Sequence, residues 1–261
     1  MMTVKPILRY QLREYFKVFS TFYGVIYSLI VVTLLLKYTR SAPEGQISCI
    51  EIATMVACFV VGLVLFKNAF RFFTSCGASR RRLFCGLTAA IAVTAAAVSL
   101  LDTVNAAVFS NFIDYRTIYW TMATQEGQNG TFLFSYSLGS AGNFTLHLMP
   151  LPLLLKNWLW CLLSDFGIAM VGFLIGALYY RMSMPVKILV SVGVPSFCFI
   201  FLPLLDFNVT HGVIGRFVAA SFAQWTNWGL NPGLDLLTRL AVCALIAGGI
   251  WLLLRKADLY H

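Results

Sequence analysis

Six apolar runs, each long enough to cross a lipid bilayer as a helix, follow one another along the chain. They fall at residues 20–36, 49–66, 83–101, 151–180, 188–205 and 234–254. A helical span needs about 20 apolar residues, because each residue adds about 1.5 Å. Within a bilayer the backbone must satisfy its own hydrogen bonds, and a helix does so inside one segment. The sequence therefore predicts an all-α polytopic membrane protein, with six transmembrane helices in a single transmembrane domain over residues 1–261.

The composition supports this fold class and bears on the partners of the chain. Hydrophobic residues make up 59% of it and charged residues only 11%, whereas a soluble domain carries about 25% charged residues. The formal net charge is +9, which in a soluble protein could indicate nucleic-acid binding. In a membrane protein the same charge meets anionic lipid. We therefore expect a lipid membrane as partner and no nucleic acid.

The basic residues are unevenly distributed between the two sides of the predicted membrane. Most of them lie in the N-terminal segment, in residues 67–82, in the turn at 181–187 and in the tail at Arg255 and Lys256. Lysine and arginine between spans mark the cytoplasmic side. This predicts a multi-pass protein of the plasma membrane with both termini in the cytoplasm, and with segments 102–150 and 206–233 outside the cell.

The N-terminal segment has an amphipathic pattern. Its basic residues recur every four positions, and its apolar residues gather on the opposite side. This pattern predicts an interfacial helix over residues 1–19 that lies on the inner membrane surface. A cytosolic helix packed against a partner is the alternative. The membrane-surface residues are Lys5, Arg9, Arg13 and Lys17.

A basic, aromatic element at residues 67–82 follows the second span. Phe70 and Phe73 share one helical face, Gly77 can end that helix and Ser79 can cap the next one. We expect a short amphipathic helix, a glycine turn and a helix that re-enters the bilayer behind three arginines. A soluble partner could press on this element, or its aromatic residues could seat it on lipid. Its candidate residues are Lys67, Phe70, Arg71, Phe72, Phe73, Gly77, Ser79, Arg80, Arg81 and Arg82.

A second, weaker contact with a cytoplasmic partner is expected at the short turn before the fifth span, at Arg181, Met182 and Lys187.

Small residues predict where helices pack closely in the membrane. The third span is rich in alanine, and Gly172 and Gly176 stand four residues apart in the fourth span. Because hydrophobic driving force between helices is weak in lipid, small residues mark close helix contacts. We therefore expect the third span to lie centrally in the bundle.

Asp165 is the one acid that lies well inside a predicted span. Asp165 is in the fourth span and Arg239 is in the sixth, at similar depth from the outer side. Unpaired charges inside a membrane are costly, so we expect the two to pair. The pair could lock the two spans together, or Asp165 could belong to a path for substrate or protons.

No motif for catalysis or metal binding is found in the sequence. Five of the seven cysteines lie in apolar runs and no metal-ligand spacing occurs, so we expect neither disulfide nor metal site. No phosphate-binding loop, nucleophile motif or histidine–carboxylate cluster is present. We expect no catalytic residue and no cofactor in this chain, which is therefore not predicted to be an enzyme.

The arrangement resembles the permease subunits of type-2 ATP-binding-cassette exporters, the bacterial kind that handles lantibiotics, antimicrobial peptides or drugs. The resemblance rests on the interfacial N-terminal helix, the six spans, the long outer hairpin before the last span and the RKADL tail at 255–259. Its most specific part is SCGASRRRLF at 75–84.

This resemblance implies an ATP-driven exporter of an amphipathic substrate. Two permease subunits, identical or homologous, would each dock on a separate cytosolic ATPase, and that ATPase would bind ATP and Mg. The coupling helix, at about residues 67–76, would sit in a groove of the ATPase with Phe70, Phe72 and Phe73 as anchors.

Two other functions remain compatible with the sequence. The chain could be a secondary transporter or channel that works without an ATPase, which would favour more intramembrane charge and internal repeats. It could also be an immunity or sensor protein that binds peptides at its outer face. A bound ATPase separates the exporter from both alternatives.

Overall fold

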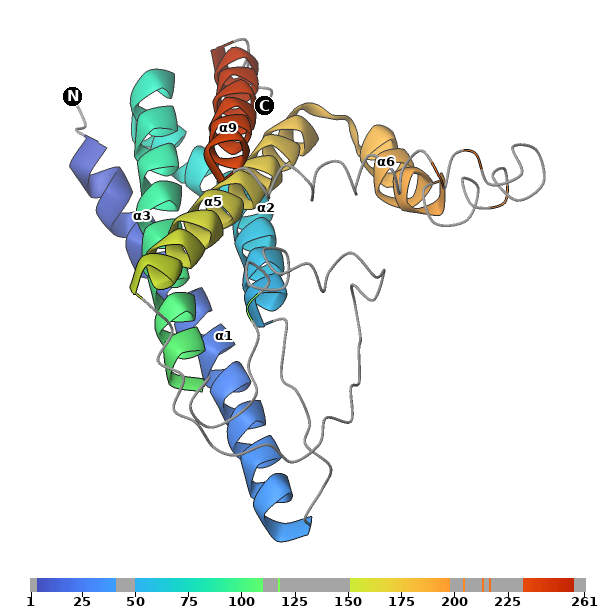
Figure 1. The fold of residues 1–261 in the computed structure, drawn as a ribbon. Coiled ribbons are helices and arrows are strands. Elements are labelled where there is room, and N and C mark those ends of the chain that lie inside the picture. The colour runs from blue at the N-terminus through green and yellow to red at the C-terminus, as the bar shows by residue number, and fades with distance from the viewer. Residues whose placement is uncertain are drawn as a thin grey trace.

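The computed structural model describes residues 4–40, 50–109, 151–197 and 232–255, together with residues 117, 204, 213 and 216. The described part is helical and contains no strand (Figure 1). Its helices are α1 (Val4–Arg40), α2 (Ile50–Ser75), α3 (Arg80–Phe109), α5 (Leu151–Arg181), α6 (Met184–Ser196) and α9 (Pro232–Arg255).

Four of these helices are long and apolar enough to cross a membrane. Their candidate spans are Lys5–Val32, Arg80–Phe109, Leu154–Tyr180 and Leu236–Leu253. Helix α2 adds a shorter apolar stretch, Ile50–Val64. The all-helical fold predicted from the sequence is thus confirmed, with four helices that could span a membrane, and the count of six spans stays a prediction.

Helix α1 differs from the expected division into an interfacial helix and a first span. It runs without a break from Val4 to Arg40, through the predicted boundary at residues 19 and 20. One stripe at four-residue spacing stays buried along it, formed by Ile7, Gln11, Tyr15, Phe19 and Tyr23. Because the same face packs on the bundle on both sides of that boundary, nothing in the packing interrupts the helix there.

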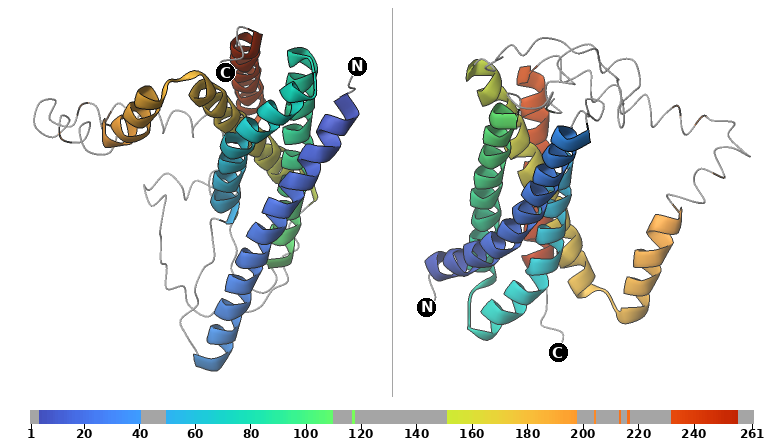
Figure 2. Two further views of the ribbon diagram at one scale, coloured as in Figure 1. Left: turned by 180° about the vertical axis from the view of Figure 1, so that it is seen from behind. Right: turned by 90° about the horizontal axis from the view of Figure 1, so that it is seen from below.

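Helix α2 also joins two elements that the sequence analysis separated. It spans Ile50–Ser75, so the predicted coupling helix is the last part of the same helix. Figure 2 shows that this last part bends away from the first part of α2 and leads toward the start of α3. The helix can therefore link a surface turn directly to the interior of the bundle.

The remaining helices begin and end close to the predicted boundaries, with two exceptions. Helix α3 continues eight residues beyond the expected end at 101, to Phe109. Helix α6 (Met184–Ser196) begins four residues before the expected start of the fifth span at 188, and most of that span after residue 197 lies outside the described residues. Most of segments 37–48, 102–150 and 198–233 lies outside the described residues, as does the tail after Arg255.

Helices α3 and α5 are central in the bundle. Helix α5 contacts α2, α3 and α9, and α3 contacts α1, α2, α5 and α9. The central position predicted for the alanine-rich span is confirmed. The closest approach joins α2 to α5, where a side chain at Gly62 would collide with the carbonyl oxygen of Ala169, and one at Gly172 with that of Phe59.

The connections between the helices define two ends of the bundle. The N-terminal end of α1, the α2–α3 turn, the α5–α6 connection and the C-terminal end of α9 lie together at one end (Figure 2, right). We call this the basic end, because Lys5, Arg9 and Arg81 are exposed there. The start of α2, the end of α3 and the start of α5 lie toward the opposite end.

Candidate functional site

The turn at the basic end is built around Gly77. Its φ angle is 73°, in the left-handed region that glycine adopts without steric cost. The amide of Gly77 donates to the carbonyl oxygen of Thr74 at 3.0 Å, and the amide of Ala78 donates to that of Phe73 at 3.0 Å. These bonds satisfy carbonyls that a helix end leaves open. The predicted role of Gly77 in ending the helix is confirmed.

The next helix begins two residues later. Ser79 is exposed and directly precedes Arg80, the first residue of α3. Its carbonyl oxygen accepts a 3.0 Å hydrogen bond from the amide of Leu83, which is the first bond expected of an N-cap residue. Ser79 thus occupies the predicted N-cap position, and the α2–α3 turn contains only Cys76 to Ser79.

Two of the predicted aromatic anchors are buried within the chain itself. Phe70 is 2% exposed and its ring centroid lies 5.0 Å from that of Tyr180 on α5. Phe73 is 1% exposed and meets the ring of Tyr10 on α1 edge-on at 5.6 Å. The expectation that these rings face a partner is therefore corrected: they fasten the end of α2 to α1 and α5.

Phe72 is the aromatic residue of this element that reaches the surface. It is 47% exposed and stacks on Tyr10 with a centroid distance of 5.3 Å and an interplanar angle of 16°. Its position is also supported by an edge contact with Phe73 at 5.1 Å. One face of a well-supported ring therefore remains available at the basic end.

The three arginines that open α3 differ in exposure. Arg81 is exposed, whereas Arg80 and Arg82 are half-buried and take part in interactions within the chain. The side chains of Lys67 and Arg71 lie outside the described part of the structure. Among the described aromatic and basic side chains of the predicted coupling element, Phe72 and Arg81 are thus the exposed ones.

The predicted basic stripe on α1 is exposed along its whole length. Lys5, Arg9, Arg13 and Lys17 all face away from the bundle. Lys17 forms an ion pair with Glu14 at 2.9 Å, on the surface of the same helix. The stripe is therefore placed to meet lipid headgroups or a partner, and both alternatives remain open.

The second predicted contact lies where α5 leads into α6. The amide of Met182 donates to the carbonyl oxygen of Tyr179 at 3.3 Å, which closes the end of α5. Met182 and Lys187 are half-buried, and the side chain of Arg181 lies outside the described residues. This connection is at the basic end beside the α2–α3 turn, as the right panel of Figure 2 shows.

Arg239 makes its described contacts with Ser164 and Trp160 of α5, and not with Asp165. Its Nη1 atom donates to Ser164 Oγ at 2.7 Å, and its guanidinium carbon lies 4.7 Å from the centroid of Trp160. The ion pairs found among the described residues do not include Asp165 with Arg239. The expected meeting of α5 and α9 at this level is correct, whereas the predicted ion pair is replaced by a hydrogen bond and a cation–π contact.

The sequence analysis treated Asp165 as the one acid well inside a span, but two further acids are buried in the bundle. Glu51 of α2 is 1% exposed and Asp102 of α3 is 2% exposed. Tyr23 of α1 donates a 2.7 Å hydrogen bond from Oη to Asp102 Oδ1. Three helices therefore contribute one buried carboxyl group each, and we call Glu51, Asp102 and Asp165 together the acidic centre.

A signal for Asp102 was present in the sequence. The buried face of α3 carries Ile91, Ala95, Val98, Asp102 and Asn105, which alternate at spacings of four and three residues, typical of one helix face. Extending the third span by two turns would have put Asp102 on that face. Helix α3 does extend this far, so residue 102 belongs to the bundle.

Three side chains of α5 have buried polar atoms without a hydrogen-bond partner: those of Asn157, Trp158 (its Nε1 atom) and Asp165. Asp165 is 1% exposed, and its Oδ2 atom has no hydrogen-bond partner. Asn157 is 2% exposed, and neither polar atom of its side-chain amide has one. The two residues lie about two helical turns apart. Buried polar groups are nearly always hydrogen-bonded, so these atoms are unusual.

The described residues contain no group of three or more histidine, cysteine or acidic side chains that could hold a metal ion. The described cysteines, which are Cys58, Cys76, Cys85, Cys161 and Cys243, are free.

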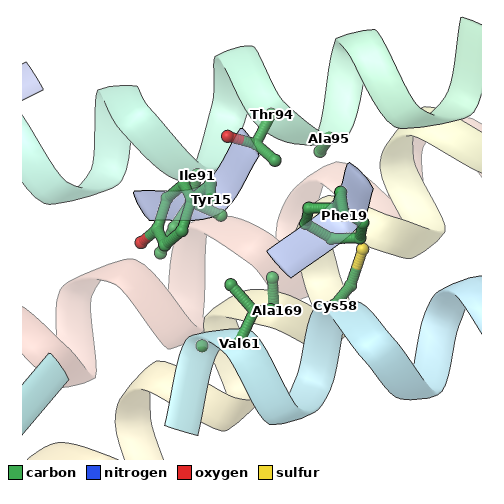
Figure 3. A pocket seen from close by; sticks show the side chains of 9 residues that line it. Tyr15, Phe19, Cys58, Val61, Ile91, Thr94, Ala95 and Ala169 are labelled. Atoms are coloured by element: carbon green, nitrogen blue, oxygen red, sulfur yellow. The ribbon is translucent and has the colours of Figure 1, made fainter. Parts of the chain in front are cut away.

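A small cavity lies among α1, α2, α3 and α5, and none of the three acids of the acidic centre lines it (Figure 3). It holds about 10 Å³, which is close to the room that one water molecule requires. Cys58 lines it and interacts electrostatically with Asp102 and Asp165, and Ala169 lines it one turn along α5 from Asp165. The other lining residues are Tyr15, Phe19, Val61, Gly62, Ile91, Thr94 and Ala95.

No protein-family model, curated protein or solved structure matches the chain. Its function is therefore inferred from the two features described above, the α2–α3 turn and the acidic centre.

Proposed function

We propose that the chain is the membrane-spanning permease subunit of an ATP-driven exporter, moving an amphipathic substrate out of the cell. The observation that carries the proposal is the α2–α3 turn closed at Gly77, with Phe72 and Arg81 exposed on the two helices that flank it. Aromatic and arginine side chains dominate the binding energy of protein interfaces. A soluble ATPase that binds ATP and Mg would dock on this turn, with a second permease subunit, identical or homologous, beside the first.

The supports of the turn suit it to transmit force. Phe73 and Tyr10 hold it against α1, and the contact of Phe70 with Tyr180 holds it against α5. Helix α2 then continues into the bundle, where its backbone touches that of α5 at Gly62 and Gly172. A displacement of the turn would therefore be carried to α5 and to the acidic centre, rather than absorbed at the surface.

The test is purification from the native host in mild detergent, followed by identification of the soluble protein that accompanies the chain. We expect a stoichiometric ATPase, which Phe72→Ala and Arg81→Ala each weaken by about tenfold or more in affinity. Phe16→Ala and Val18→Ala are controls, because both side chains are exposed on α1 outside its basic stripe. Thermal unfolding of each variant should show that the fold is retained.

Either of two outcomes would refute this proposal. One is a chain that carries no ATPase while the pure protein moves substrate in liposomes. The other is an ATPase whose binding responds equally to the α1 controls and to the turn variants.

A transporter that works without an ATPase is the second candidate, and the acidic centre favours it. Three buried carboxyl groups are more intramembrane charge than the sequence analysis assumed, and such residues often mark ion or proton pathways. Transport by the pure protein, driven by an ion gradient alone, would establish this candidate instead.

A further inference from the structure

The basic stripe of α1 is a charged surface that the proposed docking of an ATPase leaves unused. Its side chains, which are those of Lys5, Arg9, Arg13 and Lys17, are exposed. They recur at every fourth position, so they lie on one face of the helix about one turn apart. The stripe therefore presents a row of positive charge along the outside of the bundle.

The charges of the stripe are not balanced within the part of the chain that the structure describes. Lys17 pairs with Glu14 at 2.9 Å, so the net charge of that pair is zero. Lys5, Arg9 and Arg13 form no ion pair with any described residue. Like charges at one-turn spacing repel one another. These cations are therefore placed to attract an anionic partner.

The contact of Tyr10 with α2 indicates where the stripe lies along the bundle. Tyr10 follows Arg9 directly in the chain and stacks on Phe72 with a centroid distance of 5.3 Å, close to the α2–α3 turn. Arg9 is thus near the level of that turn at the basic end. Arg13 comes one turn further along α1. The stripe therefore begins at the basic end and continues inward along the side of the bundle.

The helix that carries the stripe favours lipid over a soluble protein as its partner. The stripe lies within Lys5–Val32, a stretch that is long and apolar enough to cross a membrane. Exposed side chains on such a helix face the bilayer or its headgroup layer. Helical side chains also lean toward the N-terminus of their helix, which for α1 is the basic end (Figure 2). Long basic side chains of the stripe can therefore reach back to headgroup phosphates.

We propose that Arg9 and Arg13, together with Lys5, bind the headgroup phosphates of anionic phospholipids in the leaflet at the basic end. Arginine binds phosphate through paired N–H donors. The two arginines are about 6 Å apart along the helix axis, so one headgroup can contact both. The bound lipid balances the charge of the stripe and holds α1 beside Phe72. This site goes beyond the proposed function and does not depend on it.

The first experiment counts the lipids that the full chain retains. Native mass spectrometry is applied to the chain released from micelles that contain equal amounts of phosphatidylglycerol and phosphatidylcholine. Arg9→Gln with Arg13→Gln removes two unbalanced charges. Glu14→Gln with Lys17→Gln is the matched control, because it removes two charges from the same helix and leaves the net charge unchanged. Arg9→Lys with Arg13→Lys keeps the charge and loses only the paired donors.

The wild type should retain phosphatidylglycerol in preference to phosphatidylcholine. Each basic residue near an anionic lipid surface adds about fivefold in affinity. The preference should therefore fall by on the order of tenfold or more in the double glutamine variant of Arg9 and Arg13. The matched control should keep the wild-type preference, and the double lysine variant should keep most of it. An equal loss in the control overturns the proposal, as does a wild type without preference, which a stripe reserved for a soluble partner predicts.

A second measurement uses the wild-type chain, so it does not depend on the folding of a variant. Thermal unfolding is followed in nanodiscs of phosphatidylcholine, with and without phosphatidylglycerol, at low and at high salt. A lipid that binds the folded chain stabilises it, so phosphatidylglycerol should raise the unfolding temperature by several degrees at low salt. The rise should shrink at high salt, because salt screens exposed charges.

Either of two results of this measurement contradicts the lipid site. One is an unfolding temperature that is the same in both lipid compositions, and the other is a rise that salt leaves unchanged. Neither experiment involves an ATPase, so failure of the lipid site leaves the proposed function standing, and the reverse also holds.

Discussion

Tyr23 Oη and Asp102 Oδ1 are 2.7 Å apart and join α1 to α3 inside the bundle. One turn further along each helix, Tyr27 Oη donates to Asn105 Oδ1 at 3.0 Å. A tyrosine ladder on α1 therefore faces a polar ladder on α3. The Tyr23 bond is buried, whereas Tyr27 is 38% exposed. The first bond both attaches α1 and gives Asp102 a fixed partner within the acidic centre.

Removal of the Tyr23 hydroxyl should cost more than removal of the Tyr27 hydroxyl. In Tyr23→Phe a buried carboxyl group loses its donor, and we expect a loss of about 1–2 kcal/mol in stability. In Tyr27→Phe the exposed position allows other partners, and we expect about 0.6 kcal/mol or less, near the average for interhelical bonds in membranes. Reversible unfolding in mixed micelles measures both. An equal or larger loss in Tyr27→Phe would contradict the greater importance of the buried bond.

A methyl group added at the α2–α5 contact should separate the two helices. In Gly62→Ala and Gly172→Ala the new Cβ meets a backbone carbonyl of the facing helix, and backbone cannot move aside as a flexible side chain can. We expect each variant to lose about 1–3 kcal/mol, the usual cost of overpacking.

Gly24→Ala and Gly248→Ala are the controls for that comparison, since nothing lies within 4 Å of the added atom at either position. These changes should be neutral or stabilise the helix by about 0.5–1 kcal/mol. A loss of stability in the controls would contradict this explanation. Unchanged stability in Gly62→Ala and Gly172→Ala would show that α2 and α5 are not held together by this close contact.

Sequence reasoning located the helices better than it located their inward faces. The boundaries of α5 and α9 and the role of Gly77 were predictable, because apolar length and a left-handed glycine are local signals. The burial of Phe70 and Phe73 was not. In a membrane protein apolar side chains face lipid as well as other helices, so the pattern shows which residues share a face but not what that face meets.

The acidic centre illustrates the same difficulty for polar residues. Asp102 follows the end of an apolar run, and hydropathy alone assigned it to an outer segment. Its burial depends on α3 continuing to Phe109 and on Tyr23 facing it from α1. Both are properties of the packed bundle, and the two residues are 79 positions apart in the chain.

Substitutions at Gly77 should follow the cost of a left-handed backbone. With φ at 73°, Gly77→Ala should lose about 1 kcal/mol of stability, and Gly77→Asn should lose less, because asparagine tolerates this region better. Gly193→Ala in α6 is a control, since an added Cβ there meets nothing within 4 Å. If the alanine and asparagine variants at Gly77 were equally stable, the turn would have relaxed to another conformation.

The side of the membrane that the basic end faces can be tested with Cys76, one of two exposed cysteines among those that the structure describes. Cys76 is exposed in the α2–α3 turn, whereas Cys58, Cys161 and Cys243 are buried. In a variant that keeps Cys76 alone, a membrane-impermeant maleimide should label inside-out vesicles and leave intact cells unlabelled, since basic segments between spans remain in the cytoplasm. A variant that keeps the buried Cys58 alone should label in neither preparation, which controls for nonspecific labelling. Labelling of Cys76 in intact cells would place the turn outside, out of reach of any cytosolic ATPase.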